Sequence, residues 1–104
     1  MDLTKRQEKG QMSIKVRGAM TIYEASTLRK ELLECLEDHD SLVLDLEEVS
    51  NCDTAGVQVI CSAIKTVTDA GKTFSVRAMS AEVVQAAFRA GLDANKGFGP
   101  ANEV

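Results

Sequence analysis

The chain has 104 residues, of which 44% are apolar and 27% are charged, so it has the size and composition of one compact domain. Its formal net charge of −4 is unlike that of a nucleic-acid-binding domain, and no apolar run approaches the roughly 20 residues that a membrane-spanning helix needs. Three cysteines without a CxxC spacing indicate neither a disulfide framework nor a zinc site, so we expect no metal and no cofactor. The first ten residues are charged and unlike a secretory signal peptide, so we expect a cytoplasmic protein.

The first predicted elements are two short strands and a long helix. Alternating apolar and polar residues predict a half-buried strand over 12–17. Gly18 interrupts this pattern, and residues 19–22 can resume an extended conformation. A helix of about four turns is then expected to begin near Tyr23 or Glu24. Its apolar stripe consists of Leu28, Leu32, Cys35 and Leu36.

The middle of the chain predicts a buried strand and a second helix. The short apolar run 42–46 is typical of a central strand with helices packed against the sheet. A polar loop is expected over 47–52. The segment 54–70 then has apolar residues at helical spacing, and Gly71 follows it at the position of a C-cap. The apolar positions of this helix are Val57, Ile60, Cys61, Ile64 and Val67.

The last part of the chain predicts a strand over 73–78 and a helix that starts at Ser80 and ends before Gly91. The apolar face of that helix is expected to hold Val83 or Val84, Ala87 and Phe88. Residues 93–104 have too little apolar content to pack extensively and are expected to form a mobile tail. Strands that alternate with helices in this way predict one α/β layer with right-handed crossovers between parallel neighbours.

The most informative stretch is the elbow Asp53-Thr54-Ala55-Gly56, where the buried strand and its loop give way to a helix. A hydroxyl at a helix N-terminus is exposed and well sited to carry an anion, so Thr54 is a candidate phosphorylation site. We expect Asp53 to be the N-cap and Gly56 to permit close backbone approach by a partner. Taken alone, the same residues also fit an ordinary N-cap followed by a threonine that hydrogen-bonds locally.

Acidic residues are concentrated in one part of the chain. Residues 31–64 contain no Lys or Arg and hold nine of the sixteen acids. If the fold brings 31–40 near 45–53, the result is an acidic face that favours a partner with Arg or Lys and disfavours nucleic acid. The alternative is that these charges solvate one face of a helix.

The stretch Leu44-Asp45-Leu46-Glu47-Glu48-Val49-Ser50-Asn51-Cys52-Asp53-Thr54-Ala55-Gly56-Val57 resembles the signature of the STAS domain of bacterial anti-sigma-factor antagonists. Gly18, the pair Gly71-Lys72 and the closing Ala87-Phe88-Arg89-Ala90-Gly91-Leu92 are also similar to that family. The resemblance covers about residues 10–92 and leaves 93–104 as the tail. It implies a single STAS-like α/β domain with an about four-stranded mixed sheet and helices packed on it.

The resemblance implies a binding switch and not an enzyme. A serine/threonine kinase with a histidine-kinase-like ATP fold, itself the anti-sigma factor, is expected to phosphorylate Thr54, and a phosphatase of the PP2C type to reverse this. The unphosphorylated form is expected to bind the anti-sigma partner and so free the sigma factor. The expected partner-binding residues are Asp45, Glu47, Glu48, Asp53, Thr54, Ala55 and Gly56.

Two other readings stay open. The family commonly has serine at the position of Thr54, and threonine occurs in members whose loop binds partners without clear kinase control. The chain is therefore alternatively an accessory subunit of a transporter or of a chemosensory signalling complex, with no phosphorylation. A purely structural module would be indifferent to substitution of Thr54. His39 has no second histidine or cysteine pair near it, so we expect a solvated turn residue and no base for a catalytic triad with Thr54.

Overall fold

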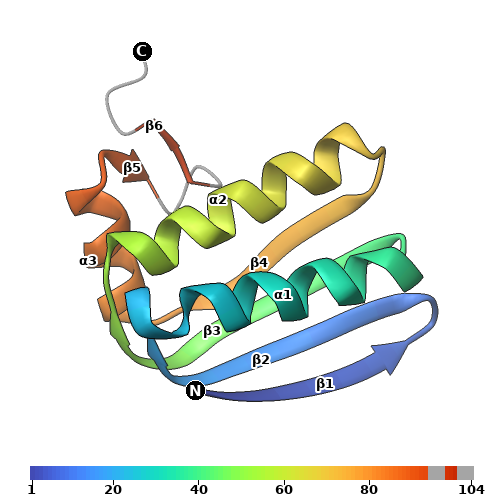
Figure 1. Ribbon diagram of the computed structural model, residues 1–104, viewed down its shortest axis with the longest axis horizontal. Coiled ribbons are helices and arrows are strands. Elements are labelled where there is room, and N and C mark those ends of the chain that lie inside the picture. Colours follow the sequence, from blue (N-terminus) through green and yellow to red (C-terminus); the bar gives the residue numbers. More distant parts are fainter. Residues whose placement is uncertain (94–97, 101–104) are drawn as a thin grey trace.

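The computed structural model describes residues 1–93 and 98–100, which form one α/β layer with a small C-terminal ribbon (Figure 1). The elements in chain order are β1 (Asp2–Glu8), β2 (Gln11–Met20), α1 (Ile22–Asp38), β3 (Ser41–Cys52), α2 (Thr54–Asp69), β4 (Thr73–Met79), α3 (Ala81–Arg89), β5 (Leu92–Asp93) and β6 (Gly99–Pro100). The sequence prediction of an α/β domain is confirmed.

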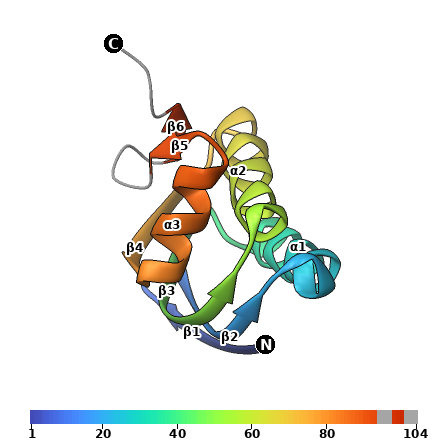
Figure 2. The same cartoon turned by 90° about the vertical axis from the view of Figure 1, so that its left-hand side faces the viewer.

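The main sheet has four strands in the order β1-β2-β3-β4. β1 is antiparallel to β2, whereas β2, β3 and β4 are mutually parallel, so the sheet is mixed as expected. Figures 1 and 2 show α1 and α2 side by side over one face of this sheet, with α3 at one end. Because each helix follows a parallel strand, all three helices begin at the same edge of the sheet, where those strands have their carboxyl ends.

The N-terminal strand β1 was not predicted. It pairs with β2 from Asp2↔Arg17 to Glu8↔Gln11, so the sheet begins before residue 10, the boundary that the resemblance suggested. Its run of charged residues hides the alternation that marks a strand, because an edge strand tolerates charge on its exposed side. β2 continues through Gly18 as a single strand, with a register shift between Gly18 and Ala19.

The polar loop predicted over 47–52 is wrong, because β3 extends to Cys52. Its second half pairs with β2 from Arg17↔Glu48 to Met20↔Cys52, with one register shift just before this stretch and one within it. Glu47 and Glu48 are exposed while Val49 and Cys52 are buried, so the irregular pairing breaks the regular alternation that a sequence pattern can detect. The extended strand leads straight to the start of α2.

The predicted apolar stripes form most of the core. The four stripe residues of α1 are buried as predicted, and so are Val57, Ile60 and Val67 of α2. Cys61 and Ile64 are only partly buried. The additional buried side chains of α2 are those of Val59 and Ala63.

The prediction that Phe88 packs in the core is wrong, because its side chain is 73% exposed. Helix α3 buries Val83, Ala86 and Ala87. Phe88 follows Val83 by five residues and therefore lies about 140° around the helix from it. The helix turns its small alanines toward the sheet and leaves this aromatic side chain outside.

The C-terminal tail is partly structured. β5 pairs with β6 through Leu92↔Pro100 and Asp93↔Gly99, and Phe98 is 5% exposed within the core cluster. Of the tail predicted over 93–104, Asp93 and Phe98 to Pro100 are thus paired or packed in the structure. The rest of that prediction, for 94–97 and 101–104, lies outside the described residues.

Candidate functional site

The elbow is built around one carboxylate that caps two helices. Asp53 Oδ1 accepts a hydrogen bond from the backbone N–H of Gly56 at 3.0 Å, as predicted for the N-cap of α2. Its second oxygen, Oδ2, accepts from the backbone N–H of Ile22, also at 3.0 Å, at the start of α1. The sequence pattern did not reveal this second bond, which joins residues 31 positions apart. The N-termini of α1 and α2 are thus held together.

The charge of Asp53 is stabilised by these bonds. Partial burial acts to raise its pKa, but the backbone N–H groups of Ile22, Gly56 and Ala55 donate to the carboxylate and bring the pKa below its ordinary value. The group is therefore anionic at neutral pH. A negative charge at two helix N-termini also interacts favourably with both helix dipoles.

A capping box fixes the start of α1 beside the elbow. The Thr21 hydroxyl accepts from the Tyr23 backbone N–H at 3.3 Å, and Glu24 Oε1 accepts from the Thr21 backbone N–H at 2.9 Å and from its hydroxyl at 2.8 Å. The backbone and hydroxyl donors of Thr21 lower the pKa of Glu24. The sequence prediction missed this cap, although the Thr-x-x-Glu spacing was there to indicate it.

Thr54 is the first residue of α2 and is exposed, as the elbow pattern predicted. In the described part of the chain its hydroxyl has no hydrogen-bond partner, so the local bond considered as an alternative is not formed. Ala55 is partly buried. The elbow therefore presents one free hydroxyl, on a backbone that is held by the caps at Asp53 and Thr21.

Gly56 has a different role from the predicted one. It is buried, and a Cβ at this position would lie 2.1 Å from the carbonyl oxygen of Met20 and 3.2 Å from its Cγ. The close approach that requires glycine is thus made by the chain's own strand β2 and not by a partner. Gly56 therefore allows the start of α2 to pack closely against β2.

Asp45 does not join the elbow. It precedes Asp53 by eight residues on an extended strand, roughly 25 Å along the chain at about 3.3 Å per residue. Its side chain is only 5% exposed and accepts from Arg77 Nη2 at 2.9 Å and from the Glu47 backbone N–H at 3.0 Å. Burial acts to raise its pKa, but these donors bring it below the ordinary value. Asp45 is a buried, paired charge of the sheet.

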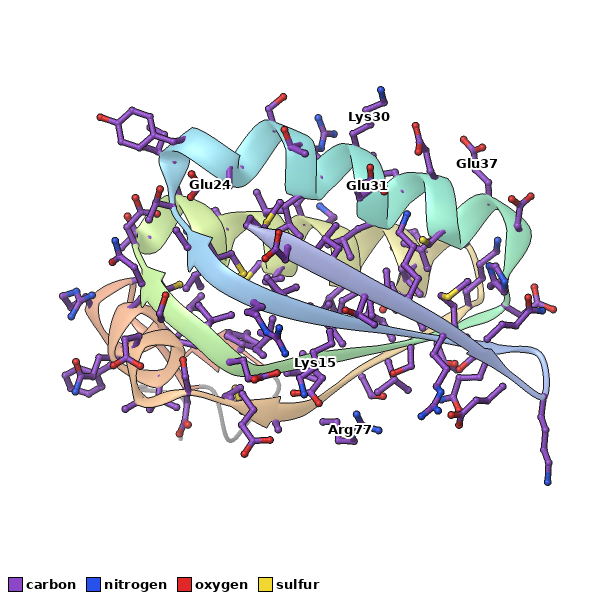
Figure 3. The ribbon with its side chains drawn as sticks, turned by 90° about the horizontal axis from the view of Figure 1, so that it is seen from below. Lys15, Glu24, Lys30, Glu31, Glu37 and Arg77 are labelled. Atoms are coloured by element: carbon purple, nitrogen blue, oxygen red, sulfur yellow. The ribbon has the colours of Figure 1, made fainter. Side chains whose placement is uncertain are left out.

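Glu48 is also engaged within the sheet. It lies 2.6 Å from Lys15 Nζ and 3.4 Å from Arg17 Nη2, and the Lys15 hydrogen bond lowers its pKa. Figure 3 shows Lys15 and Arg77 on the side of the sheet that the helices do not cover, while Glu31 and Glu37 project from α1. The acids of β3 and those of α1 therefore lie on opposite sides of the sheet, and the single acidic face considered above is not formed. Glu47 is exposed and precedes Thr54 by seven residues along the chain.

His39 is not a solvated turn residue, because its Nδ1 lies 2.8 Å from the Cys35 carbonyl oxygen at the end of α1. The Lys72 ammonium donates to the neighbouring Leu36 carbonyl, so two side chains complete the same helix end. Within residues 1–93 and 98–100 no group of three or more His, Cys, Asp or Glu is placed to hold a metal ion. None of the helices described is both long enough and apolar enough to cross a membrane.

The comparisons with known proteins agree with this fold. Residues 3–98 match the family model described as "Mlab, STAS domain", which covers nearly the whole chain. The chain therefore belongs to the STAS domain family. A sequence search of curated proteins finds no match.

Solved structures share the architecture at low sequence identity. An anti-sigma factor antagonist from Mycobacterium paratuberculosis is 18% identical, with a TM-score of 0.78 over 93% of this chain and 81% of that one. The anti-sigma factor antagonist SpoIIAA in its unphosphorylated form is 13% identical, with a TM-score of 0.69 over 86% of this chain and 81% of that one. A protein named Mglu is 18% identical over 71% of this chain, with a TM-score of 0.64. The match covers 19% of Mglu, so the chain corresponds to about a fifth of that protein.

Proposed function

We propose that the chain is a regulatory protein–protein interaction switch of the anti-sigma-factor-antagonist type, acting in the cytoplasm through the state of Thr54. The observation that carries the proposal is the exposed, unbonded Thr54 hydroxyl at the first residue of α2. It stands next to Asp53, whose carboxylate holds the N-termini of α1 and α2 together. The similarity in fold to two anti-sigma factor antagonists supports the same conclusion.

The proposed partner is a serine/threonine kinase with a histidine-kinase-like ATP fold that serves as the anti-sigma factor. The unphosphorylated elbow binds this kinase and thereby frees the sigma factor. Transfer of phosphate to Thr54 releases the chain, and a PP2C-type phosphatase restores the binding form. The partner surface in this proposal is the part of the elbow from Asp53 to Ala55, without the buried Gly56. Asp45 and Glu48 are left out because they are paired within the sheet.

The local physics makes such a switch workable. A phosphate adds about −1.5 to −2 charges, and at an exposed helix start it faces solvent and the positive end of the helix dipole, so the fold tolerates it. In a bound complex the same charge is buried beside the anionic Asp53. A buried charge without a partner costs about 3–5 kcal/mol, which is enough to weaken binding by a factor of 100 or more.

A second candidate is an accessory subunit of a transporter or of a chemosensory signalling complex, which uses the same elbow without phosphorylation. Two observations favour it. The matching family model is described as Mlab, and the fold also occurs as about a fifth of the longer protein Mglu, so this domain is used in more than one setting. In this reading the Thr54 hydroxyl is a contact and not a phosphate acceptor.

Affinity capture from lysate of the native cell tests the proposal, with wild-type, Thr54→Ala and Thr54→Glu baits and identification of retained proteins by mass spectrometry. The switch predicts a histidine-kinase-like serine/threonine kinase on wild type and Thr54→Ala but not on Thr54→Glu. Because glutamate carries about half the charge of a phosphate, a negative result with it is repeated with authentic phosphothreonine. Recovery of a transporter ATPase equally on all three baits would support the accessory subunit and refute the switch.

A further inference from the structure

The two edges of the main sheet differ in how well they are protected against pairing with a further strand. β1 and β4 are the outer strands, and within residues 1–93 and 98–100 neither has a strand on its outer side. Four of the seven residues of β1 are charged, which protects an edge because a pairing strand would have to accommodate those charges. The first four residues of β4, Thr73 to Val76, contain no charged residue, no proline and no glycine. The edge of β4 therefore lacks this protection over that stretch.

The pairing of β4 with β3 shows which of its backbone groups point outward. The N–H of Thr73 donates to the carbonyl oxygen of Asp40 at 3.0 Å, so the backbone of Thr73 faces β3. Alternate residues of a strand direct their N–H and C=O groups to opposite sides, so those of Phe74 and Val76 point away from β3. The register shift after Val76 makes Arg77 an extra residue and ends this regular run. Two residues of the open edge thus each offer one donor and one acceptor.

The side chains of β4 leave this edge partly open on the face that the helices cover. Phe74 and Val76 pack against the core but are only partly buried. Thr73, Ser75 and Arg77 are exposed, and Figure 3 shows Arg77 on the uncovered side of the sheet. A further strand beside β4 would cover the two apolar side chains, and it would meet two small hydroxyl residues on the other face.

We propose that β4 pairs antiparallel with β4 of a second copy of this chain, about a two-fold axis at Ser75. In this register Phe74 of each copy lies opposite Val76 of the other, so the outward N–H and C=O groups of the two residues can bond to each other. An aromatic ring then lies beside a β-branched side chain, which is a favourable cross-strand pair. Thr73 lies opposite Arg77, so no like charges meet. The two four-stranded sheets become one continuous sheet.

The edge fits itself in this register better than in its neighbours. An axis at Phe74 would place Val76 opposite Lys72, whose N–H already donates to the Val67 carbonyl oxygen at 2.9 Å. An axis at Val76 would need residues beyond the register shift, where the alternation of backbone directions is broken. Only the axis at Ser75 keeps two pairs of outward-facing residues. A contact of this isologous kind uses the same surface on both copies and closes as a dimer.

A disulfide at the proposed axis tests the register in the full chain. Ser75→Cys would place two thiols opposite each other, in a non-hydrogen-bonded pair whose Cα atoms are about 4.5 Å apart, within reach of a disulfide. Mild oxidation is expected to give a reducible covalent dimer on non-reducing electrophoresis. Thr73→Cys is the matched control, because it is exposed on the same strand but faces Arg77 of the other copy, and it is expected to stay monomeric. Wild type controls for the three natural cysteines, which are free.

Association of the unmodified chain is measured by sedimentation velocity over a concentration series. The contact of one strand edge is small, so a weak and reversible dimer is expected, with a mass that rises from 11.2 kDa toward twice that value. Ser75→Arg sets two like charges opposite each other at the axis and is expected to weaken association about tenfold. Thr4→Arg is the matched control, because Thr4 is exposed on the opposite edge strand, and it is expected to leave association unchanged. Circular dichroism establishes that the variants are folded.

Three results would overturn the inference. A mass that stays at 11.2 kDa at every concentration, without crosslinking of Ser75→Cys, would mean that this edge does not pair with a second copy. Association that Ser75→Arg leaves unchanged would place the contact between copies elsewhere on the molecule. Crosslinking of Thr73→Cys as readily as Ser75→Cys would refute the register. None of these measurements involves Thr54, so the proposed switch stands or fails separately.

Discussion

The substitution Gly56→Ala is expected to destabilise the domain, although it adds only one methyl group and replaces glycine in a helix. The new Cβ would lie 2.1 Å from the Met20 carbonyl oxygen and 3.0 Å from the carbonyl carbon. These are backbone atoms of β2 and cannot rotate away, so the start of α2 has to move by about 1 Å to reach ordinary contact. Overpacking of this kind costs about 1–3 kcal/mol and occasionally more. The movement also disturbs the bonds of Asp53 to Gly56 and Ile22, each worth about 1 kcal/mol.

Alanine has a higher helix propensity than glycine, which offsets about 1 kcal/mol of this cost. The net loss is therefore about 2–3 kcal/mol. Urea unfolding followed by circular dichroism measures it as a lower midpoint at an unchanged slope, and thermal unfolding as a drop of about 10–20 °C. Ala55→Ser is the control, because it adds one atom at the neighbouring, partly buried position and is expected to change stability by less than about 0.5 kcal/mol. Equal stability of Gly56→Ala and wild type would refute the assignment of Gly56 to close packing against β2.

Three further predictions test the site and the sheet. Asp53→Asn is expected to cost about 1 kcal/mol at pH 7, because an amide has one acceptor oxygen where the carboxylate accepts from the N–H groups of Ile22 and Gly56 with two. The pKa of Asp53 is lower in the folded than in the unfolded chain, so its contribution to stability is full above the unfolded-state pKa near 4 and is lost as the pH falls through the folded-state pKa. The urea midpoints of wild type and Asp53→Asn should therefore converge in acid. A difference between the midpoints that does not change with pH would count against this. Arg77→Met should lower the free energy of unfolding by about 1–3 kcal/mol, because it removes the cation paired with the buried Asp45, and by much less in an Asp45→Asn background. Partner binding should stay unchanged. A loss of binding would mean that Asp45 belongs to the interface. Phe88→Ser is expected to alter stability by less than about 0.5 kcal/mol, whereas a loss of 3 kcal/mol or more would mean that Phe88 is packed in the core.

Local sequence patterns predicted the structure correctly where interactions between residues close in the sequence determine it. The apolar stripe of α1 recurs every three or four residues, and all four of its members are buried. The caps at Asp53 and Ser80 were predicted for the same reason, since each side chain reaches a backbone N–H only three residues further along. The elbow was found because it combines an N-cap with an exposed hydroxyl between two recognisable elements.

The pattern failed where the environment comes from distant parts of the chain. β1 was missed because its residues Asp2–Glu8 are mostly charged, and only pairing with β2 makes them a strand. Phe88 was predicted to lie in the core because the spacing of apolar residues predicts a helix but does not determine which side of a short helix packs against the sheet. Asp45 and Glu48 of β3 were predicted to be available to a partner, because their ion-pair partners Arg77 and Lys15 lie about 30 residues away in the sequence.

The amino-acid sequence by itself determined the α/β alternation, the central apolar strand, the amphipathic helices and the exposed threonine at the start of α2. These depend on periodicity and on hydrogen bonds within a few residues. Only the tertiary structure decided that Asp53 caps two helices, that Gly56 is needed by the chain's own strand and that Asp45 is a buried ion-pair partner. The physical reason is that burial, close packing and pairing of charges depend on distances across the fold, which the order of residues along the chain does not contain.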